Sequence, residues 1–551
     1  MSVLKSSAWM ALGTILSRIL GFLRAILLAA MIGVTTNAAD AFGVANQLPN
    51  NVYVIIVGGV LNAVLVPQLV KSHRNDADGG KGYVDRLLTL AITVFAGITV
   101  VATVAAPVLV HLYTHNWNNN QLALATAFAY WCLPQLFFYG LYSVLGEVLN
   151  SRSAFGPFMW APVLNNVVSL AGMAAFVILF GLDPAGFRGV ENWSEAQISL
   201  LAGTATLGVA SQALILFVSW KRIGLNFKFN FNWRGVGLRP AVKAATWTLA
   251  MVIVTQLAGL VQSAVASLPA ASREQGQAGL GVASIAAASI AWLIFMLPHS
   301  VFTVSLATAY FTRLTTHAHE EATENFKTDL GEGLRLISMV SILAATLLMV
   351  LAYPAARVFV GEYPATIALG NVIIALMLGL LPFSLNFFLQ KAFYALEDTK
   401  TPFYTTLVQA SVFTASALLI AWLAPASQVV VWLSLATTFA ALIQVTLAAR
   451  TLKARIGAYA IGLWSSMFKF ALAAIGAGLV GYGLLGLFGG AAQGSFALST
   501  VLAAMIASAI VAVAVVAVFV ILLKAFKAPE ADALFGFLRA SVQKLKGIAR
   551  R

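Results

Sequence analysis

The chain has 551 residues, of which 60% are hydrophobic and only 9% are charged. A soluble domain carries about 25% charged residues, so this composition excludes a water-soluble globular protein. The net charge of +14 is more typical of basic loops between membrane helices than of a nucleic-acid-binding surface. No nucleic-acid partner is therefore expected.

In chain order the sequence is a succession of apolar stretches, each long enough to cross a hydrocarbon core of roughly 30 Å. Their length favours a bundle of helices over a barrel of short alternating strands. The first stretch is not expected to be a cleavable signal peptide, because it continues past Ile32 without a small-residue cleavage site. Fourteen transmembrane helices are predicted, at 7–33, 41–70, 85–113, 122–150, 157–182, 199–222, 240–268, 279–311, 329–360, 366–395, 403–424, 428–452, 465–489 and 498–526.

The connections between these helices alternate in charge. One set offers only Arg188 and Arg273 as cations, whereas the other set is strongly basic. The positive-inside rule puts the basic set in the cytoplasm together with both termini, which agrees with an even number of helices. The basic set comprises Lys71, Arg74, Lys81, Arg86, Arg152, Lys221, Arg222, Lys228, Arg234, Arg239, Lys243, Arg313, Lys327, Lys400, Arg450, Lys453 and Arg455.

Two motifs of the first half recur in the second half at a nearly constant offset. Leu48–Tyr53 resembles Leu297–Phe302, and Leu133-Pro134 resembles Leu381-Pro382. The repeat unit would hold six helices, and an even number places both copies the same way up, related by an axis along the membrane normal. This symmetry is typical of transporters. It predicts an N-lobe at 1–228 and a C-lobe at 229–455, followed by two helices within 456–526 and a tail at 527–551.

The tail is predicted to form a short basic amphipathic helix. Phe535, Leu538 and Val542 can share one face, with arginines and lysines around them. Such a helix lies on an anionic membrane surface. The alternative is a disordered basic tail that only helps to orient the chain.

Two arginines, Arg18 and Arg24, lie within the first predicted helix. An arginine that faces lipid at that depth costs about 2.5 kcal/mol or more. One interpretation is that both line a polar cavity, where a guanidinium binds a phosphate through two hydrogen bonds. The other is that they snorkel, or form structural ion pairs with Asp40 or Glu147.

Other polar residues of the predicted helices also leave two interpretations open. Asp40 is either a helix N-cap or part of a site, and Asn165 either a helix-packing residue or a substrate contact. Glu147 and Lys391 are candidates for coupling or gating, or else lie at a cytoplasmic rim. His299 either titrates in a cavity or is a neutral packed histidine.

The sequence offers no visible catalytic or metal-binding arrangement. The single cysteine, Cys132, excludes an intramolecular disulfide and a thiolate-based metal site. No loop carries a HExxH motif, a P-loop or a Ser/His/Asp set, so no enzymatic activity, metal or cofactor is expected. Prolines in helix interiors are predicted to kink their helices; these are Pro49, Pro134, Pro298 and Pro382.

Several motifs carry a family resemblance. Leu16–Arg24, with the sequence LSRILGFLR, resembles the opening signature of the MurJ/MviN-type lipid II flippases. Asp40–Phe42 and Leu48–Asn50 resemble the DAF and LPN motifs of that family. Further similar segments are Leu149–Ser151, Ala161–Asn165, Gly333–Arg335 and Ala392–Pro402.

This resemblance implies the MOP exporter fold, with two six-helix lobes around a cationic cavity and two further helices that form a lipid-tail groove. It also implies a multi-pass protein of the bacterial plasma membrane, monomeric, with lipid II and membrane lipids as partners. Lipid II, a peptidoglycan precursor on an undecaprenyl pyrophosphate, would move from the cytoplasmic to the outer leaflet by alternating access. The implied substrate-binding residues are Arg24, Arg18, Asp40, Asn50 and Asn165.

The chain departs from the family pattern at several positions. Ala25 stands where an aspartate is frequent, and the cationic pair beyond the LPN motif falls on Tyr53 and Val54. An arginine of the eighth helix falls on Leu293. Of the expected basic cavity only the two first-helix arginines remain, so substrate capture is expected to be rearranged.

Two other functions remain open at this point. One is an exporter of the same fold that moves a polysaccharide-linked lipid, or a drug against sodium or protons; the missing arginines favour it. The other is a non-transporting scaffold that recruits cell-wall synthesis proteins through its cytoplasmic loops and tail. The ordered family motifs favour the flippase over both.

Overall fold

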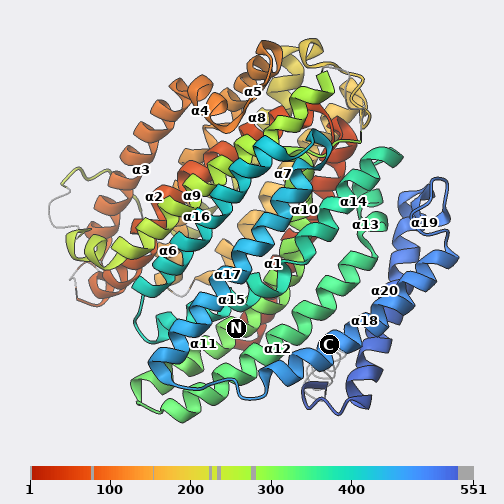
Figure 1. Ribbon diagram of the computed structural model, residues 1–551. Coiled ribbons are helices and arrows are strands. Elements are labelled where there is room, and N and C mark those ends of the chain that lie inside the picture. The colour runs from red at the N-terminus through yellow and green to blue at the C-terminus, as the bar shows by residue number, and fades with distance from the viewer. Residues whose placement is uncertain are drawn as a thin grey trace. The chain divides into compact units, whose positions relative to one another are not determined.

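The computed structural model describes residues 3–75, 78, 80–152, 154–222, 226–232, 238–274 and 281–531. All regular secondary structure in this part of the chain is helical (Figure 1). The predicted all-α class is therefore confirmed. The predicted amphipathic helix of the tail lies beyond residue 531, outside the described residues.

The helices follow one another with short connections. They are α1 (Val3–Ile32), α2 (Asn37–Asn75), α3 (Lys81–Val104), α4 (Ala106–Tyr113), α5 (Asn119–Cys132), α6 (Gln135–Ser151), α7 (Phe155–Phe180), η1 (Val190–Asn192), α8 (Glu195–Arg222), α9 (Leu238–Glu274), α10 (Ile285–Pro298), η2 (His299–Thr303), α11 (Val304–His319), α12 (Thr323–Val350), α13 (Ala352–Phe359), α14 (Tyr363–Met377), α15 (Leu380–Ala395), α16 (Lys400–Leu423), η3 (Ala426–Gln428), α17 (Val429–Ile456), α18 (Leu463–Leu487), α19 (Phe496–Ser499) and α20 (Val501–Ala525).

The predicted membrane spans are found in the described part of the chain. Twelve helical segments there are long and apolar enough to cross a membrane, and the count rises to 13 if α14 and α15, which meet at 43°, form one bent span. The second predicted span, 41–70, corresponds to α2, a helix of 39 residues that is not among the segments counted. The protein is thus a multi-pass membrane protein.

Several predicted helices are broken, and prolines explain most of the breaks. The predicted helix 85–113 divides at Ala105, just before Pro107, and 329–360 divides at Leu351, just before Pro354. Proline lacks an N–H and its ring clashes with the carbonyl four residues earlier. The kink predicted at Pro134 is confirmed as the break between α5 and α6, but α2 runs through Pro49 without a break.

The chain forms two compact units. Unit 1 comprises 1–287, 359–365 and 417–429, and unit 2 comprises 288–358, 366–416 and 430–551. Unit 1 thus includes α9, which follows the predicted lobe boundary at residue 228. Because the predicted lobes were defined by sequence symmetry and not by contacts, their boundaries stay a prediction.

In unit 1, α2 packs against α5, α6 and α9, while α7 packs against both α1 and α8. The α7–α8 contact is close because of glycines. A Cβ on Gly172 would lie 2.3 Å from Thr204, and one on Gly208 would lie 2.5 Å from Asn165. Small residues let membrane helices approach in this way and hydrogen-bond to each other.

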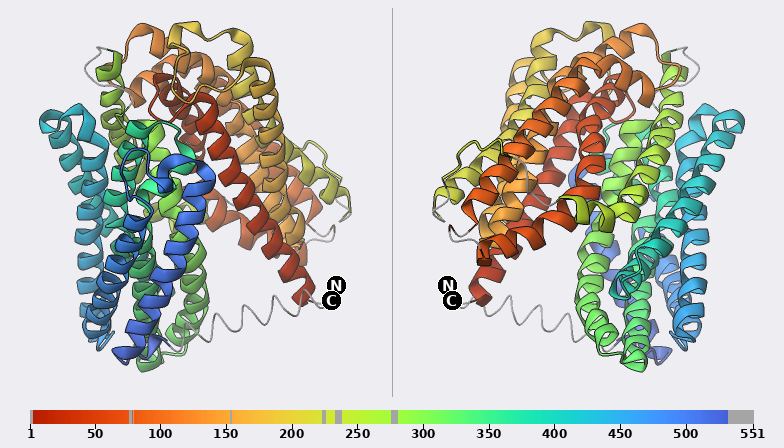
Figure 2. Two further views of the ribbon diagram at one scale, coloured as in Figure 1. Left: turned by 90° about the vertical axis from the view of Figure 1, so that its right-hand side faces the viewer. Right: turned by 90° about the vertical axis from the view of Figure 1, so that its left-hand side faces the viewer.

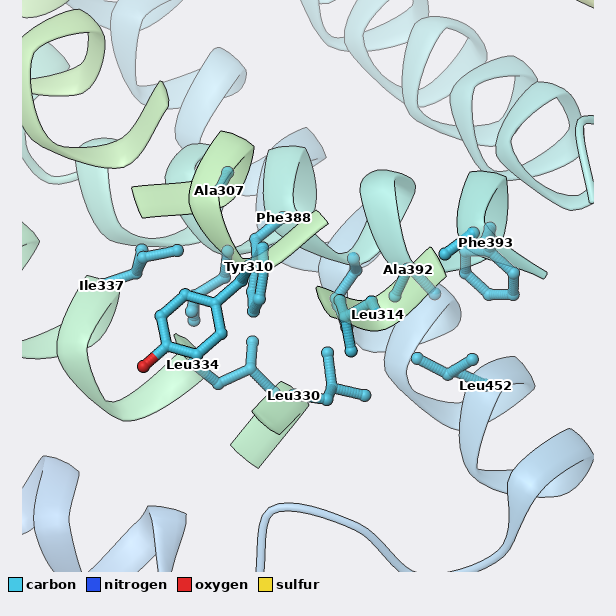
Figure 3. Packing of buried hydrophobic residues seen from close by; sticks show 14 of the residues in the cluster. Ala307, Tyr310, Leu314, Leu330, Leu334, Ile337, Phe388, Ala392, Phe393 and Leu452 are labelled. Atoms are coloured by element: carbon cyan, nitrogen blue, oxygen red, sulfur yellow. The ribbon is translucent and has the colours of Figure 1, made fainter. Parts of the chain in front are cut away.

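In unit 2, α11, α12, α15 and α17 enclose an apolar core that contains Tyr310, Leu334 and Phe388 (Figure 3). The helices α18 and α20 form a hairpin that packs against α12 (Figure 2). At the end of this hairpin, Glu530 is buried and its Oε1 lies 3.1 Å from Nε of Arg335 in α12. The hairpin is therefore fixed to unit 2 by apolar packing and by an ion pair.

Candidate functional site

The exposed face of α2 is polar. Between Asn37 and Asn50 the only exposed residues are Gln47 and Asn50, with Asn46 half-buried beside them, whereas Leu48 is fully buried. A lipid-facing stripe would be apolar, since exposed amides are costly in hydrocarbon. This face of α2 is therefore suited to a water-filled space, and it includes the predicted substrate residue Asn50.

A second polar stripe runs along α6. Gln135, Tyr139, Ser143 and Glu147 recur at intervals of four residues, which places them on one face of the helix. At 1.5 Å per residue the stripe is about 18 Å long. It leads from the break at Pro134 toward the predicted cytoplasmic end of the helix.

Hydrogen bonds join the start of the α6 stripe to α2 and α8. Gln135 Nε2 donates to Asn46 Oδ1 at 3.2 Å and to Thr206 Oγ1 at 3.1 Å. The hydroxyl of Tyr139 donates to Gln135 Oε1 at 3.2 Å. The amide of Gln135 thus has partners on both its oxygen and its nitrogen, although it is buried.

Further along the α6 stripe, Tyr53 of α2 contacts two of its residues. Its hydroxyl hydrogen-bonds to Ser143 Oγ, and its ring centroid lies 5.6 Å from that of Tyr139. Glu147, half-buried one turn beyond Ser143, interacts electrostatically with Tyr53 and lies beside Asn150. Tyr53 therefore belongs to a network of hydroxyl groups that extends to the carboxyl group of Glu147.

Arg24 of α1 is half-buried and lies next to this network. The titratable side chains that interact with it electrostatically are Tyr139 and Cys132, both neutral. Among the described residues Arg24 forms no ion pair and no hydrogen bond. The alternative that it pairs with Asp40 or Glu147 is therefore wrong, and its guanidinium can accept an anion.

Arg18 and Asn165 have different surroundings. Arg18 is exposed on α1, six residues before Arg24. Asn165 Nδ2 donates to Gln212 Oε1 at 2.8 Å, and Asn165 Oδ1 accepts a hydrogen bond from Ser169. The contact with Gln212 joins α7 to α8 and favours the helix-packing interpretation of Asn165.

Asp40 is fully buried and has a cationic partner of its own. Its Oδ2 lies 3.1 Å from Nη1 of Arg273 in α9, and its Oδ1 accepts the backbone N–H of Ala286 at 2.9 Å. The N-cap interpretation is wrong, because α2 begins at Asn37 and the hydroxyl of Thr36 accepts a first-turn N–H. Asp40 therefore lies in a buried ion pair.

The candidate gating residues of unit 2 are packed among aromatic rings. His299 is buried against Phe383 and Phe387, and its Nδ1 lies 3.1 Å from Ser384 Oγ. This environment favours the packed histidine. It begins a short π-helical turn after Pro298, a distortion frequent at functional sites.

Lys391 lies further along α15 in unit 2. Its Nζ lies 5.4 Å from the ring centroid of Phe311, 5.5 Å from that of Phe387 and 6.0 Å from that of Tyr394. Three aromatic faces therefore stabilise this ammonium by cation–π contact.

Two apolar grooves on unit 1 are separate from the polar stripes. One, between α4 and α5, has a volume of about 740 Å³, and the other, against α5, α7 and α8, has a volume of about 550 Å³. Neither is lined by an arginine, a lysine or a carboxylate. In the described part of the chain no three His, Cys, Asp or Glu residues are grouped so that they could hold a metal ion. The polar stripes and Arg24 therefore remain the candidate site.

The family model described as lipid II flippase MurJ matches residues 28–539. The chain belongs to the MurJ family. A probable lipid II flippase MurJ from Rhizobium tropici is 27% identical over 76% of this chain and 76% of its own length. Another from Haemophilus influenzae is 25% identical over 71% of this chain and 75% of its own length.

Solved structures show the same fold. A lipid II flippase MurJ in an inward closed conformation has a TM-score of 0.70 at 18% identity, covering 93% of this chain and 98% of its own. An inward-facing multidrug resistance MATE family transporter of the MOP superfamily has a TM-score of 0.56 at 15% identity, covering 80% and 97%. The predicted MOP exporter fold is confirmed.

The residues that connect the site of this MurJ-family chain were not predicted from its sequence. No sequence motif surrounds Gln135, Tyr139 or Ser143. Thr206 is far from them in sequence, in α8. The four-residue spacing of polar side chains along an apolar helix was the signal that could have found the first three. No local pattern marks Thr206.

Proposed function

We propose that this protein moves lipid II from the cytoplasmic to the outer leaflet of the bacterial plasma membrane, with Arg24 as the pyrophosphate-binding residue. The observation that carries the proposal is an arginine in a membrane helix without a carboxylate partner among the described residues. A guanidinium binds phosphate oxygens through two parallel hydrogen bonds. The family membership supplies the substrate class.

The polar stripes of α2 and α6 would serve the rest of the head group. Asn50 and Gln47 are exposed amides, and Tyr53 and Tyr139 are half-buried phenols. Amides and hydroxyls both donate and accept hydrogen bonds, as the sugar and peptide of lipid II require. Arg18, on the same helix as Arg24, would add a second positive charge.

The polyprenyl tail would stay in lipid, along α18 and α20. Both helices carry exposed apolar side chains, among them Ile475 and Leu479 on α18 and Ile506 and Ile510 on α20. Transport would proceed by alternating access, with the positive charge of the site responding to the membrane potential. That response amounts to about 2.3 kcal/mol per charge per 100 mV.

The proposed orientation has both termini in the cytoplasm. Single cysteines at Asn118, Arg152 and Lys228, in a Cys132→Ser background, test it. Impermeant thiol reagents added outside intact cells should label only position 118. Labelling of position 228 from outside would contradict the orientation.

The function itself is tested with purified protein in liposomes that contain fluorescent lipid II. The protein should accelerate the exchange of lipid II between leaflets, and protein-free liposomes should not show this. A fluorescent phospholipid is the matched control for non-specific scrambling. If lipid II does not exchange, or the phospholipid exchanges equally fast, the proposal is wrong.

A strain depleted of its own lipid II flippase separates the alternatives in cells. The proposed flippase should restore growth, whereas a drug exporter or a non-transporting scaffold for cell-wall enzymes should not. Growth restored by a variant that is inactive in liposomes would favour the scaffold.

A further inference from the structure

The connection between α8 and α9 contains an extended segment, Asn226–Asn232, with the sequence NFKFNFN. Its phenylalanines alternate with polar residues. In an extended chain this alternation places all three phenylalanines on one side and the polar residues on the other. The flippase mechanism proposed above makes no use of the segment.

Two side chains of α3 hold this segment in place. Asp85 Oδ1 accepts the backbone N–H of Lys228 at 3.2 Å, and Thr89 Oγ1 accepts that of Asn230 at 2.9 Å. Both α3 side chains are buried. Their four-residue spacing on the helix matches the two-residue spacing on the extended segment, so the segment runs along α3 (Figure 1).

The phenylalanine side of the segment is only partly covered by protein. Phe227 packs against the apolar core of unit 1, which contains Leu145 and Trp220. Phe229 and Phe231, in contrast, are 63% and 65% exposed. Their rings are stacked 6.1 Å apart, which gives a continuous apolar strip. The exposed side chain of Lys228 lies directly before Phe229 in sequence, and Asn230 separates the two phenylalanines.

The depth of the strip identifies what covers it. Thr89 lies eight residues after the start of α3 at Lys81, which is about 12 Å along the helix. The predicted span begins at residue 85, so Thr89 lies only about 6 Å into it, within the interfacial zone of the membrane. Aromatic side chains favour this interfacial zone, and a neighbouring lysine favours anionic head groups. Lys221, also exposed, adds to the positive charge.

We propose that Asn226–Asn232 is a lipid-binding strip, clamped on α3 by Asp85 and Thr89. The rings of Phe229 and Phe231 lie among acyl chains, and the ammonium of Lys228 binds the phosphate of an anionic phospholipid. Lipid binding by the strip does not depend on lipid II transport. A negative result for the strip would therefore not contradict the proposed function.

The first test measures depth in the Cys132→Ser protein, reconstituted in phosphatidylglycerol-containing liposomes. Nitroxide labels are attached to Phe229→Cys and, as the matched control, to Lys228→Cys. The label at 229 should collide more with oxygen, which concentrates in lipid, and the label at 228 more with a water-soluble nickel complex. Equal accessibility of both labels to nickel would overturn the proposal, as would shielding of position 229 from both reagents, which indicates a protein partner.

The second test measures lipid selection. A fluorophore at Phe231→Cys should be quenched more by nitroxide-labelled phosphatidylglycerol than by phosphatidylcholine with the same chains. Lys228→Gln should reduce this preference about fivefold, which corresponds to roughly 1 kcal/mol per lysine at an anionic surface. Equal quenching by the two lipids in the parent would overturn the anionic selection.

The clamp itself is tested by substitution of Asp85. Asp85→Leu removes the acceptor and should increase the mobility of a nitroxide at position 229. Asp85→Asn keeps an oxygen acceptor and should leave the mobility unchanged. If Asp85→Leu fails to fold, Thr89→Val provides the same test at the second contact. Unchanged mobility in Asp85→Leu and Thr89→Val would contradict the clamp.

Discussion

Two of the arginines in membrane-spanning helices of unit 1, Arg273 and Arg24, have opposite surroundings. Arg273 of α9 lies 3.1 Å from the buried carboxylate of Asp40 and donates to Asn37 Oδ1 at 3.0 Å. Arg24 of α1 has the phenol of Tyr139 and the thiol of Cys132 as its electrostatic neighbours, and no carboxylate partner among the described residues.

This difference distinguishes a charged residue that stabilises the fold from one that binds a ligand. A buried cation with a carboxylate partner is already neutralised, so its removal costs stability. A cation surrounded by neutral groups can take its counter-charge from a ligand, so its removal costs binding. Mutation of Arg273 should therefore be detected in a stability assay, and mutation of Arg24 in a binding assay.

The largest effect is expected from Arg24→Ala, which should weaken lipid II binding on the order of a hundredfold, as the loss of a charged hydrogen-bonding partner does. Flipping of fluorescent lipid II in liposomes should fall accordingly, while the thermal unfolding of the protein stays near that of the parent. Arg24→Lys should retain partial activity, because a point charge attracts phosphate without binding it bidentately. Transport by Arg24→Ala at the parent rate would place the substrate elsewhere.

The opposite behaviour is expected at Asp40 and Arg273. Asp40→Ala leaves the buried guanidinium without its counter-ion, which costs ~3–5 kcal/mol. Thermal unfolding in detergent should detect this loss, and Arg24→Ala is the control that should not show it. The double variant Asp40→Leu, Arg273→Met should recover much of the stability, because neither charge is then stranded. A full loss of stability in the double variant would argue against the ion pair.

An intermediate case is the ion pair of Asp398 with Arg455, where the arginine is half exposed. Burial alone would raise the pKa of Asp398, but hydrogen bonds from Thr401 and Lys400 and the charge of Arg455 outweigh it and hold this pKa below its ordinary value of 3.8. The ionised carboxylate therefore stabilises the fold above that value, and the contribution is lost as the pH falls through the lowered pKa. Asp398→Asn keeps a cap oxygen but removes the charge that pairs with Arg455, and it should cost about 0.5 kcal/mol at pH 7, as the loss of a partly exposed ion pair does.

The measurement for Asp398 is thermal unfolding at pH 7 and at pH 3. The parent should lose more stability between these two values than Asp398→Asn does. An equal loss in both proteins would show that Asp398 is not responsible for the acid sensitivity.

The smallest effect is expected at Tyr53, whose ring lies beside that of Tyr139. Tyr53→Phe removes the hydrogen bond to Ser143, which contributes about 1 kcal/mol, but it keeps the ring beside Tyr139. Transport should stay close to that of the parent. Tyr53→Arg adds a cation beside Tyr139, which is a neighbour of Arg24, and should bind lipid II more tightly, as titration with lipid II in detergent can measure. Weaker binding by Tyr53→Arg would mean that the phosphate does not approach this face.

The amino-acid sequence by itself determined the class of this protein. Long apolar stretches fix transmembrane helices because each satisfies its own backbone hydrogen bonds in lipid, and the ordered motifs from Leu16 to Pro402 fix the family. The prolines were also informative, but the unbroken course of α2 through Pro49 was not foreseen. A proline marks a weak point in a helix, and the packing around it decides whether the helix breaks.

Only the tertiary structure decided which polar groups meet. Asp40 is paired with Arg273 and not with Arg24, because α2 packs against α9. The phenol and the thiol beside Arg24 come from α6 and α5, and the clamp of Lys228 and Asn230 comes from α3. Apolar burial is encoded locally, along each helix, whereas the pairing of charges depends on which helices become neighbours. In a membrane that choice carries the function, since an unpaired charge there must find its partner in a ligand.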